Sequence, residues 1–337
     1  MRTGPAAVAC GLGVHHLSRR IGRRRLLILC YHGVAAGPLP EGCPAWHHVD
    51  VSDFERQIRY IARHYDVLPI DRALDRLDNG SADRIACVTF DDGYRNNRSV
   101  ALPVLREAGV PATAYLATGF VATSHVLWTV ELEAAFRLSR VPEIELSALG
   151  LGARTLHTSS SRTAAAAEAI RRLKREGPAR RRPLVSDLID TLGPAPDGIL
   201  EPFRMLDWSD VAAMDEEGLV SFGAHTVNHE IVSRLDDAEL HSEIAGSVAE
   251  VGRRVKSIST TFAFPNGSPA DFDERSRRVL EEVGARAALS TIEDLNDPAV
   301  DRFALRRIVV GRGMDFDRFR LATSGFLPHA RRMRGER

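Results

Sequence analysis

The chain has 337 residues, of which 44% are hydrophobic and 27% charged, a composition typical of a globular protein with a full core. Its 45 basic and 45 acidic side chains give a formal net charge of zero, which argues against a polyanionic partner such as nucleic acid. The four cysteines form no CxxC pair, so we expect buried free thiols, as in a reducing compartment.

Residues 1–25 differ in composition from the rest of the chain. The apolar stretch from Pro5 to Val14 is far shorter than the roughly 20 residues that span a bilayer. Its basic cluster, residues 19–25, follows the apolar stretch, whereas a secretory signal carries its charge in front. We therefore expect a solvated basic leader and a cytoplasmic protein, with peripheral contact to the inner membrane surface as the alternative.

From Leu26 onward, apolar runs typical of buried strands alternate with helical patterns. Strands are predicted at residues 26–31, 67–70, 84–90, 112–117, 219–223, 261–264, 287–290 and 308–310. This alternation predicts an α/β fold with βα units around a parallel sheet, and the number of units favours a barrel over an open sheet. No GxGxxG opens the first helix, which argues against dinucleotide binding.

The segment from about 139 to 201 interrupts this alternation. It contains an alanine-rich helical run at 164–170 and turn residues at 193–196. We interpret it as a helical insertion or lid on a barrel domain of residues 26–325, and not as a second independent core. Residues 326–337 form a basic tail, of which 328–337 are expected to be disordered.

Polar residues that could carry chemistry follow three of the predicted strands. Asp91 and Asp92 follow the strand 84–90, His225 and His229 follow the strand 219–223, and His32 follows the strand 26–31. In a barrel these positions share the catalytic end. If their segment is helical, the two histidines face the same way, and with a carboxylate they would make a catalytic zinc site.

Each of these patterns has a structural explanation when it is taken alone. Adjacent aspartates before a glycine commonly mark a turn, and two histidines four residues apart occur by chance on helix surfaces. The sequence Phe264 to Gly267 could be a turn that ends a strand. Their joint occurrence at successive strand ends is what favours a functional site.

Three motifs stand at these strand ends: VTFDDGY at 88–94, HTVNH at 225–229 and FAFPNG at 262–267. They resemble the motifs of the polysaccharide deacetylases, the NodB-homology or carbohydrate esterase 4 family. Further similarity lies in LCYHGV at 29–34, PATA at 111–114 and LDWSD at 206–210, so that the resemblance covers about residues 26–325. It implies a distorted (β/α) barrel with fewer than eight strands.

The resemblance also implies a site that contains a divalent metal ion, commonly zinc. By position, Asp92, His225 and His229 would be its ligands, and Asp91 the general base that takes a proton from the attacking water. A backbone N–H near Phe264 would stabilise the oxyanion. The products would be acetate and a free amine.

The chain departs from the family pattern where many members have a late Leu-x-His motif. The late segment here, FALRRI at 303–308, contains no histidine, and His32 is the expected replacement as general acid. The alternative is that His32 only forms a hydrogen bond with a neighbouring loop. Arg306 and Arg307 are alternative partners for Asp91.

The third motif also departs from the family, because it has Phe264 where tyrosine is common. Phe264, Asn266 and Arg307 are assigned to oxyanion stabilisation and substrate binding. A backbone N–H in this motif can still stabilise the oxyanion when the tyrosine hydroxyl is absent.

The resulting prediction is a metal-dependent enzyme that removes acetyl groups from an N-acetylated sugar or polysaccharide. De-O-acetylation of a glycan is the alternative reaction, since an alkoxide leaving group needs protonation less than an amine does. A catalytically silent sugar-binding barrel is the alternative outside enzymes. A metalloprotease is disfavoured because no HExxH is present.

Overall fold

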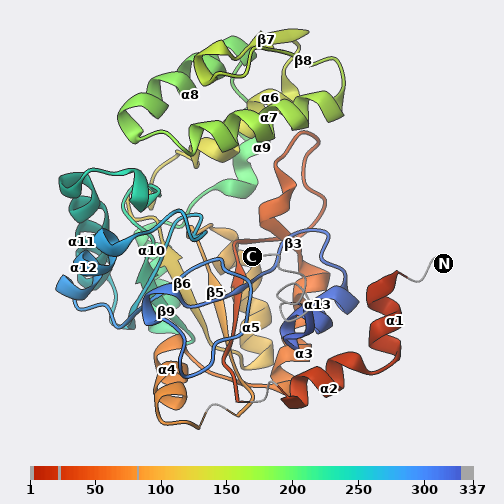
Figure 1. Ribbon diagram of the computed structural model, residues 1–337, viewed down its shortest axis with the longest axis vertical. Coiled ribbons are helices and arrows are strands. Elements are labelled where there is room, and N and C mark those ends of the chain that lie inside the picture. The colour runs from red at the N-terminus through yellow and green to blue at the C-terminus, as the bar shows by residue number, and fades with distance from the viewer. Residues whose placement is uncertain (1–3, 22–23, 82, 328–337) are drawn as a thin grey trace.

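The computed structural model describes residues 4–21, 24–81 and 83–327, and its centre is a curled parallel sheet (Figure 1). Seven parallel strands follow one another in the order β11-β10-β9-β6-β5-β1-β12, and β4 pairs in addition with β5. The strands are β1 (Leu27–Tyr31), β4 (Asp66–Val67), β5 (Ile85–Phe90), β6 (Ala112–Leu116), β9 (Val220–Ala224), β10 (Ile258–Ala263), β11 (Ala287–Leu289) and β12 (Ile308–Val309).

The segment before β12 brings the two edges of the sheet together. Leu305 forms a parallel bridge with Leu289 of β11, and Ile308 then pairs with Leu29 of β1. The side chains of β1, β5 and β6 are buried along their whole length, as expected of strands covered on both faces. The predicted distorted (β/α) barrel is therefore confirmed.

Helices cover the outside of the sheet, and their apolar faces match the periodicity of the sequence. In α3, for example, Phe54, Ile58 and Ile61 are buried on one face. The helices are α3 (Val51–His64), α4 (Ile70–Asp78), α5 (Leu102–Ala108), α10 (Trp208–Glu216), α11 (Asp237–Arg254), α12 (Glu274–Glu282) and α13 (Phe316–Thr323). Short elements complete the barrel: β2 (Gly33–Ala35), η1 (Ala45–His47), β3 (His48–Asp50), η2 (Asn97–Ala101), η5 (Val232–Arg234) and η6 (Arg302–Ala304).

The insertion forms a helical layer above one end of the barrel (Figure 1). Its elements are α6 (Trp128–Leu138), β7 (Glu143–Glu145), η3 (Ser147–Leu149), β8 (Ala153–Thr155), α7 (Ser159–Leu173), α8 (Pro178–Leu192), α9 (Asp197–Leu200) and η4 (Glu201–Phe203). Contrary to expectation, it has a hydrophobic cluster of its own, which includes Leu132, Phe136, Ala169 and Leu173. The layer also begins earlier than predicted, because the apolar face of α6 packs on α7.

The N-terminal segment folds into α1 (Pro5–Gly11) and α2 (Val14–Ile21), which lie beside α13 (Figure 1). The Cys10 thiol donates to the carbonyl of Asp317 at 3.4 Å, and the Ser18 hydroxyl donates to the carbonyl of Ser324 at 2.9 Å. The expected solvated leader is therefore wrong for the described part of this segment, because Cys10 and His15 are buried against the barrel.

Two further expectations concern the cysteines and the tail. All four cysteines are free and buried, as predicted. The disorder expected for residues 328–337 lies outside the described residues. None of the helices within the described ranges is long and apolar enough to cross a membrane.

Candidate active site

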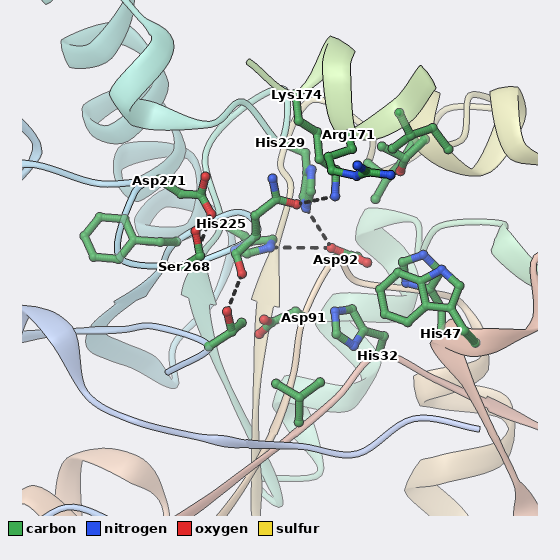
Figure 2. Close-up of a pocket in the computed structure, with 18 of the residues that line it drawn as sticks. His32, His47, Asp91, Asp92, Arg171, Lys174, His225, His229, Ser268 and Asp271 are labelled. Carbon is green, nitrogen blue, oxygen red and sulfur yellow. Dashed lines mark hydrogen bonds and ion pairs between the residues drawn. The ribbon is translucent and has the colours of Figure 1, made fainter. Parts of the chain in front are cut away.

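The polar residues that follow three of the predicted strands come together at one end of the barrel, below the insertion (Figure 2). His32 follows β1, Asp91 and Asp92 follow β5, and His225 and His229 follow β9. All five line one cavity of about 740 Å³. The prediction that strand ends would assemble these side chains is confirmed, because parallel strands place their carboxyl ends on the same side.

Asp92, His225 and His229 form a compact group with free ligand atoms. Oδ1 of Asp92 lies 3.5 Å from Nε2 of His225 and 3.2 Å from Nε2 of His229. Both carboxylate oxygens are buried, and within the described chain neither accepts a hydrogen bond of good geometry. Nδ1 of His225 donates to the carbonyl of Ala263 at 2.7 Å, which leaves Nε2 as an acceptor. A carboxylate and two imidazoles arranged in this way fit a divalent ion such as zinc.

The two histidines converge through a turn, so the condition that their segment be helical is not needed to bring them together. The residues after β9 have no helical assignment, and both Thr226 (φ 62°) and His229 (φ 54°) are left-handed. Glu243 of α11 holds the turn, since it accepts hydrogen bonds from the backbone N–H and side-chain amide of Asn228 at 2.7 and 2.6 Å. Asp92 is left-handed as well (φ 72°), so that strained backbone is concentrated among the candidate ligands.

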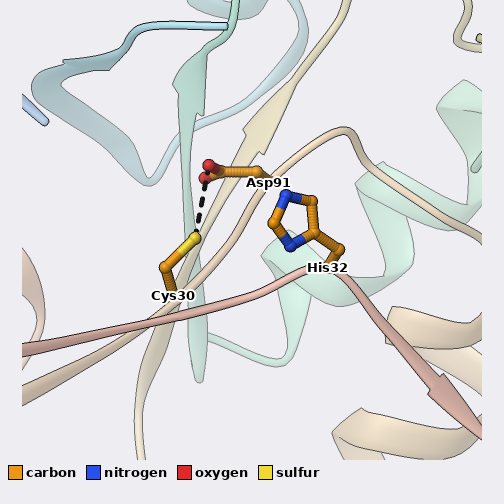
Figure 3. A group of neighbouring side chains, drawn as sticks. All are labelled: Cys30, His32 and Asp91. Atoms are coloured by element: carbon orange, nitrogen blue, oxygen red, sulfur yellow. Dashed lines mark hydrogen bonds between the residues drawn. The ribbon is translucent and has the colours of Figure 1, made fainter. Parts of the chain in front are cut away.

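Asp91 is held from behind by a buried arginine. The Arg307 guanidinium donates to both of its carboxylate oxygens at 2.8 and 2.7 Å, and the Cys30 thiol donates to Oδ2 at 3.4 Å (Figure 3). Burial raises the pKa of Asp91, but the charge and hydrogen bonds of Arg307, together with nearby His225 and His32, outweigh burial and leave this pKa below its usual value. Asp91 is therefore an ionised carboxylate directed at the cavity, as a general base must be.

The structure decides between the two arginines proposed as partners of Asp91. Arg306 pairs instead with Asp294 at 3.0 Å. Arg307 is fully buried and is not among the residues that line the cavity, so a role in contacting substrate is wrong for this residue. Its contacts assign it to the orientation and charge of Asp91.

The third motif supplies a backbone donor, and the structure distinguishes between the residues that were considered for it. The N–H of Phe264 is occupied by the carbonyl of Leu289 at 3.0 Å, and Pro265 has no N–H. Within the described part of the chain, the N–H of Asn266 has no acceptor. Asn266 lines the cavity with a left-handed backbone (φ 59°), so it is the better candidate for the oxyanion donor.

His32 has a second histidine beside it that the sequence did not indicate. The ring centroids of His32 and His47 are 5.4 Å apart, and ring nitrogens of both lie within 4.8 Å of an oxygen of Asp92. Burial lowers the pKa of His32, although Asp92 and Asp91 oppose this effect. His47 lies in η1, which follows no strand of the barrel, so its position along the sequence carried no signal.

The insertion contributes a residue that sequence reasoning also missed. Lys174, at the C-terminal end of α7, donates from Nζ to Oδ1 of Asn266 at 2.9 Å (Figure 2). The layer above the barrel is thus connected to the motif that carries the candidate oxyanion donor. In the sequence, Lys174 is notable only because the chain has just two lysines.

Comparison with known proteins supports the fold. The chain resembles Streptococcus pyogenes deacetylase PplD in complex with acetate (16% identity, 89% of this chain, 98% of that chain, TM-score 0.58). It also resembles IcaB from Ammonifex degensii (16% identity, 89% of this chain, 97% of that chain, TM-score 0.57). A third similar structure is a de-N-acetylase from Aggregatibacter actinomycetemcomitans (14% identity, 88% of this chain, 99% of that chain, TM-score 0.55). At these identities the likeness concerns the fold alone. No curated protein sequence matches the chain significantly.

A family model gives the stronger result. The model described as polysaccharide deacetylase matches residues 78–288, more than half of the chain. The match includes Asp91, Asp92, His225 and His229, and it ends before Arg307. This chain therefore belongs to the polysaccharide deacetylase family.

Proposed function

We propose that this protein is a metal-dependent deacetylase that hydrolyses the acetamide of an N-acetylated sugar or polysaccharide. The observation that carries the proposal is the pair of buried Asp92 oxygens without hydrogen-bond donors, next to two histidine nitrogens. An unpaired buried carboxylate is costly unless a cation binds it. Asp92, His225 and His229 would hold a divalent ion, most simply zinc, and leave positions open for substrate and water.

The protein's own groups can complete the reaction. When bound, zinc would supply Lewis-acid polarisation of the acetyl carbonyl and activation of water. Asp91 would take a proton from the attacking water, and the backbone N–H of Asn266 would donate to the oxyanion. His32 would then give a proton to the departing nitrogen as the carbon–nitrogen bond breaks, which yields acetate and a free amine.

Features of the cavity favour a sugar amide. Trp46 lines the cavity beside His32 and is 49% exposed, and its ring can cover the apolar face of a sugar. His32 and His47 place two possible proton donors near Asp92, and an amine leaving group needs one more than an alkoxide does. The solved relative described as a de-N-acetylase is consistent with this choice.

The direct test is acetate release by the zinc-loaded protein from matched N-acetylated and O-acetylated oligosaccharides. We expect release from the amides, its loss in the presence of a strong chelator, and its recovery when zinc is restored. Release from esters alone would establish the O-deacetylase instead. No release by zinc-bound protein would favour the silent sugar-binding barrel, and release unaffected by chelation would contradict metal dependence.

Replacing His32 with alanine is expected to slow amide hydrolysis by about 10²–10⁴-fold, the usual contribution of a positioned proton donor. An activated ester should be affected much less, because its leaving group departs without protonation. The rates on both substrates measure this difference. His47→Ala is the matched comparison, and a normal amide rate in His32→Ala with a slow rate in His47→Ala would assign the proton donor to His47.

We also propose that the N-terminal helices contact an anionic membrane surface. Val8, Leu12 and Leu17 are 51%, 78% and 63% exposed, and the arginine-rich sequence of residues 19–25 accompanies them. We expect the protein to sediment with phosphatidylglycerol vesicles but not with phosphatidylcholine vesicles, and Leu12→Ser/Leu17→Ser to weaken this binding. Equal recovery in the supernatant with both vesicles would contradict the contact.

A further inference from the structure

One face of helix α7 forms part of the cavity wall above the candidate metal ligands. Its cavity-lining residues are Ala167, Ile170 and Arg171, followed by Lys174 and Arg175 just after the helix. Successive members of this set are three, one, three and one residues apart, which is the spacing of side chains on one face of a helix. Figure 2 shows Arg171 and Lys174 reaching down from this helix toward His229. The insertion therefore presents cations to any molecule bound at the acetyl-binding end.

These cations are not neutralised within the described part of the protein. Arg171 and Arg175 form no ion pair or side-chain hydrogen bond there, and Lys174 binds only the neutral amide of Asn266. Arg234, from η5, lines the same cavity, and its Nε is buried without a hydrogen-bond partner. A buried guanidinium nitrogen without an acceptor is unfavourable, and an anion bound in the cavity would supply one.

Three carboxylates of the cavity wall, by contrast, already have partners within the described chain. Glu133 pairs with Arg137 at 2.7 Å, and Asp271 accepts hydrogen bonds from the backbone N–H and hydroxyl of Ser268 at 2.8 and 2.5 Å. Asp91 is neutralised by Arg307. Asp92 lacks hydrogen-bond donors, but it belongs to the candidate metal ligands, whereas Arg171 and Arg175 lie on the side of the insertion. The cavity's unsatisfied charge on the side of the insertion is positive.

We propose that the substrate is an acetamido sugar that carries an anionic group, a phosphate or a carboxylate, and that Arg171, Arg175 and Arg234 bind this group. The inference rests on the proposed deacetylase function and specifies its substrate class. Guanidinium groups suit both anions because their N–H groups bind two oxygens at once. The barrel would hold the acetamide, and the insertion would select the charged sugar.

The experiment compares one neutral and two anionic substrates with the zinc-loaded full-length protein. The substrates are methyl N-acetylglucosaminide, N-acetylglucosamine 1-phosphate and N-acetylglucosaminuronic acid. Acetate release gives kcat/KM for each, and calorimetric titration gives a binding constant that does not depend on turnover. The variant is Arg171→Gln/Arg175→Gln, and the matched control is Arg180→Gln, which removes an exposed arginine of α8 that does not line the cavity.

We expect at least one anionic sugar to exceed the neutral one in kcat/KM, and this ratio to fall about tenfold or more in the double variant. The control should retain the ratio, and added salt should reduce it in the unmodified protein. The favoured anion distinguishes phosphate from carboxylate.

Two other outcomes separate this inference from the proposed function. Equal release from neutral and anionic sugars would overturn the anion site and leave the deacetylase intact. Anion binding that the double variant loses, with no acetate released from any substrate, would support the anion site and overturn the deacetylase. If no anionic sugar is bound preferentially and no acetate is released, both the anion site and the deacetylase function are overturned.

Discussion

Replacing Asp91 with asparagine is expected to lower acetate release by about 10²–10⁴-fold, the range attributed to a general base. The amide has no basic oxygen that could take a proton from the attacking water. Zinc binding should persist, because the candidate ligands Asp92, His225 and His229 are unchanged. Steady-state kinetics with an N-acetylated oligosaccharide and elemental analysis of the same sample measure the two effects separately.

The control for this variant concerns the charge that it leaves behind. Arg307 is fully buried and pairs with Asp91, and loss of one partner of a buried pair can cost about 3–5 kcal/mol of folding stability. We therefore expect Asp91→Asn to melt at a lower temperature, and Asp91→Asn/Arg307→Met to recover stability without recovering activity. A folded, zinc-containing Asp91→Asn enzyme with a normal rate would exclude Asp91 as the base.

Replacing His229 with alanine is expected to weaken zinc binding by more than about 100-fold. Loss of a residue that only hydrogen-bonds to a metal ligand usually weakens metal binding by about 10–100-fold. The expected effect here is larger, because one of three direct ligands would be missing. Acetate release at low free zinc should fall in parallel. Competition with a chromophoric chelator gives the affinity.

His241→Ala provides the matched control, since His241 is an exposed histidine of α11 outside the cavity. It should bind zinc as the unmodified protein does. Full zinc occupancy of His229→Ala under the same competition would remove His229 from the ligand set.

The two halves of the cavity have different origins. The barrel end supplies the carboxylates and histidines, and α7 of the insertion supplies Arg171 and Lys174. The hydrogen bond from Lys174 to Asn266 connects them next to the candidate oxyanion donor. A lid with its own hydrophobic cluster can hold these cations in place above the site, which an unstructured loop could not do.

The local pattern of the sequence was sufficient to predict the strands of the barrel sheet and the residues at their functional ends, but not the short strands β2, β3, β7 and β8. Continuous apolar runs predict buried parallel strands, and a parallel sheet places the residues after them together whatever their separation in the chain. Asp91, Asp92, His225 and His229 could therefore be predicted as one site. The conformation of His225 to His229 stayed open, because spacing alone does not distinguish a helix from a turn held by distant Glu243.

Only the tertiary structure decided which groups surround this site. Neighbouring arginines at 306 and 307 are equivalent in the sequence, but the backbone directs Arg307 to Asp91 and Arg306 to Asp294. The free N–H of Asn266, the proximity of His47 to His32, and the cations of α7 depend on contacts between segments far apart in the chain. The sequence thus determined the strands and the residues at their ends, since these follow from local periodicity. Their partners depend on long-range packing, which no local pattern records.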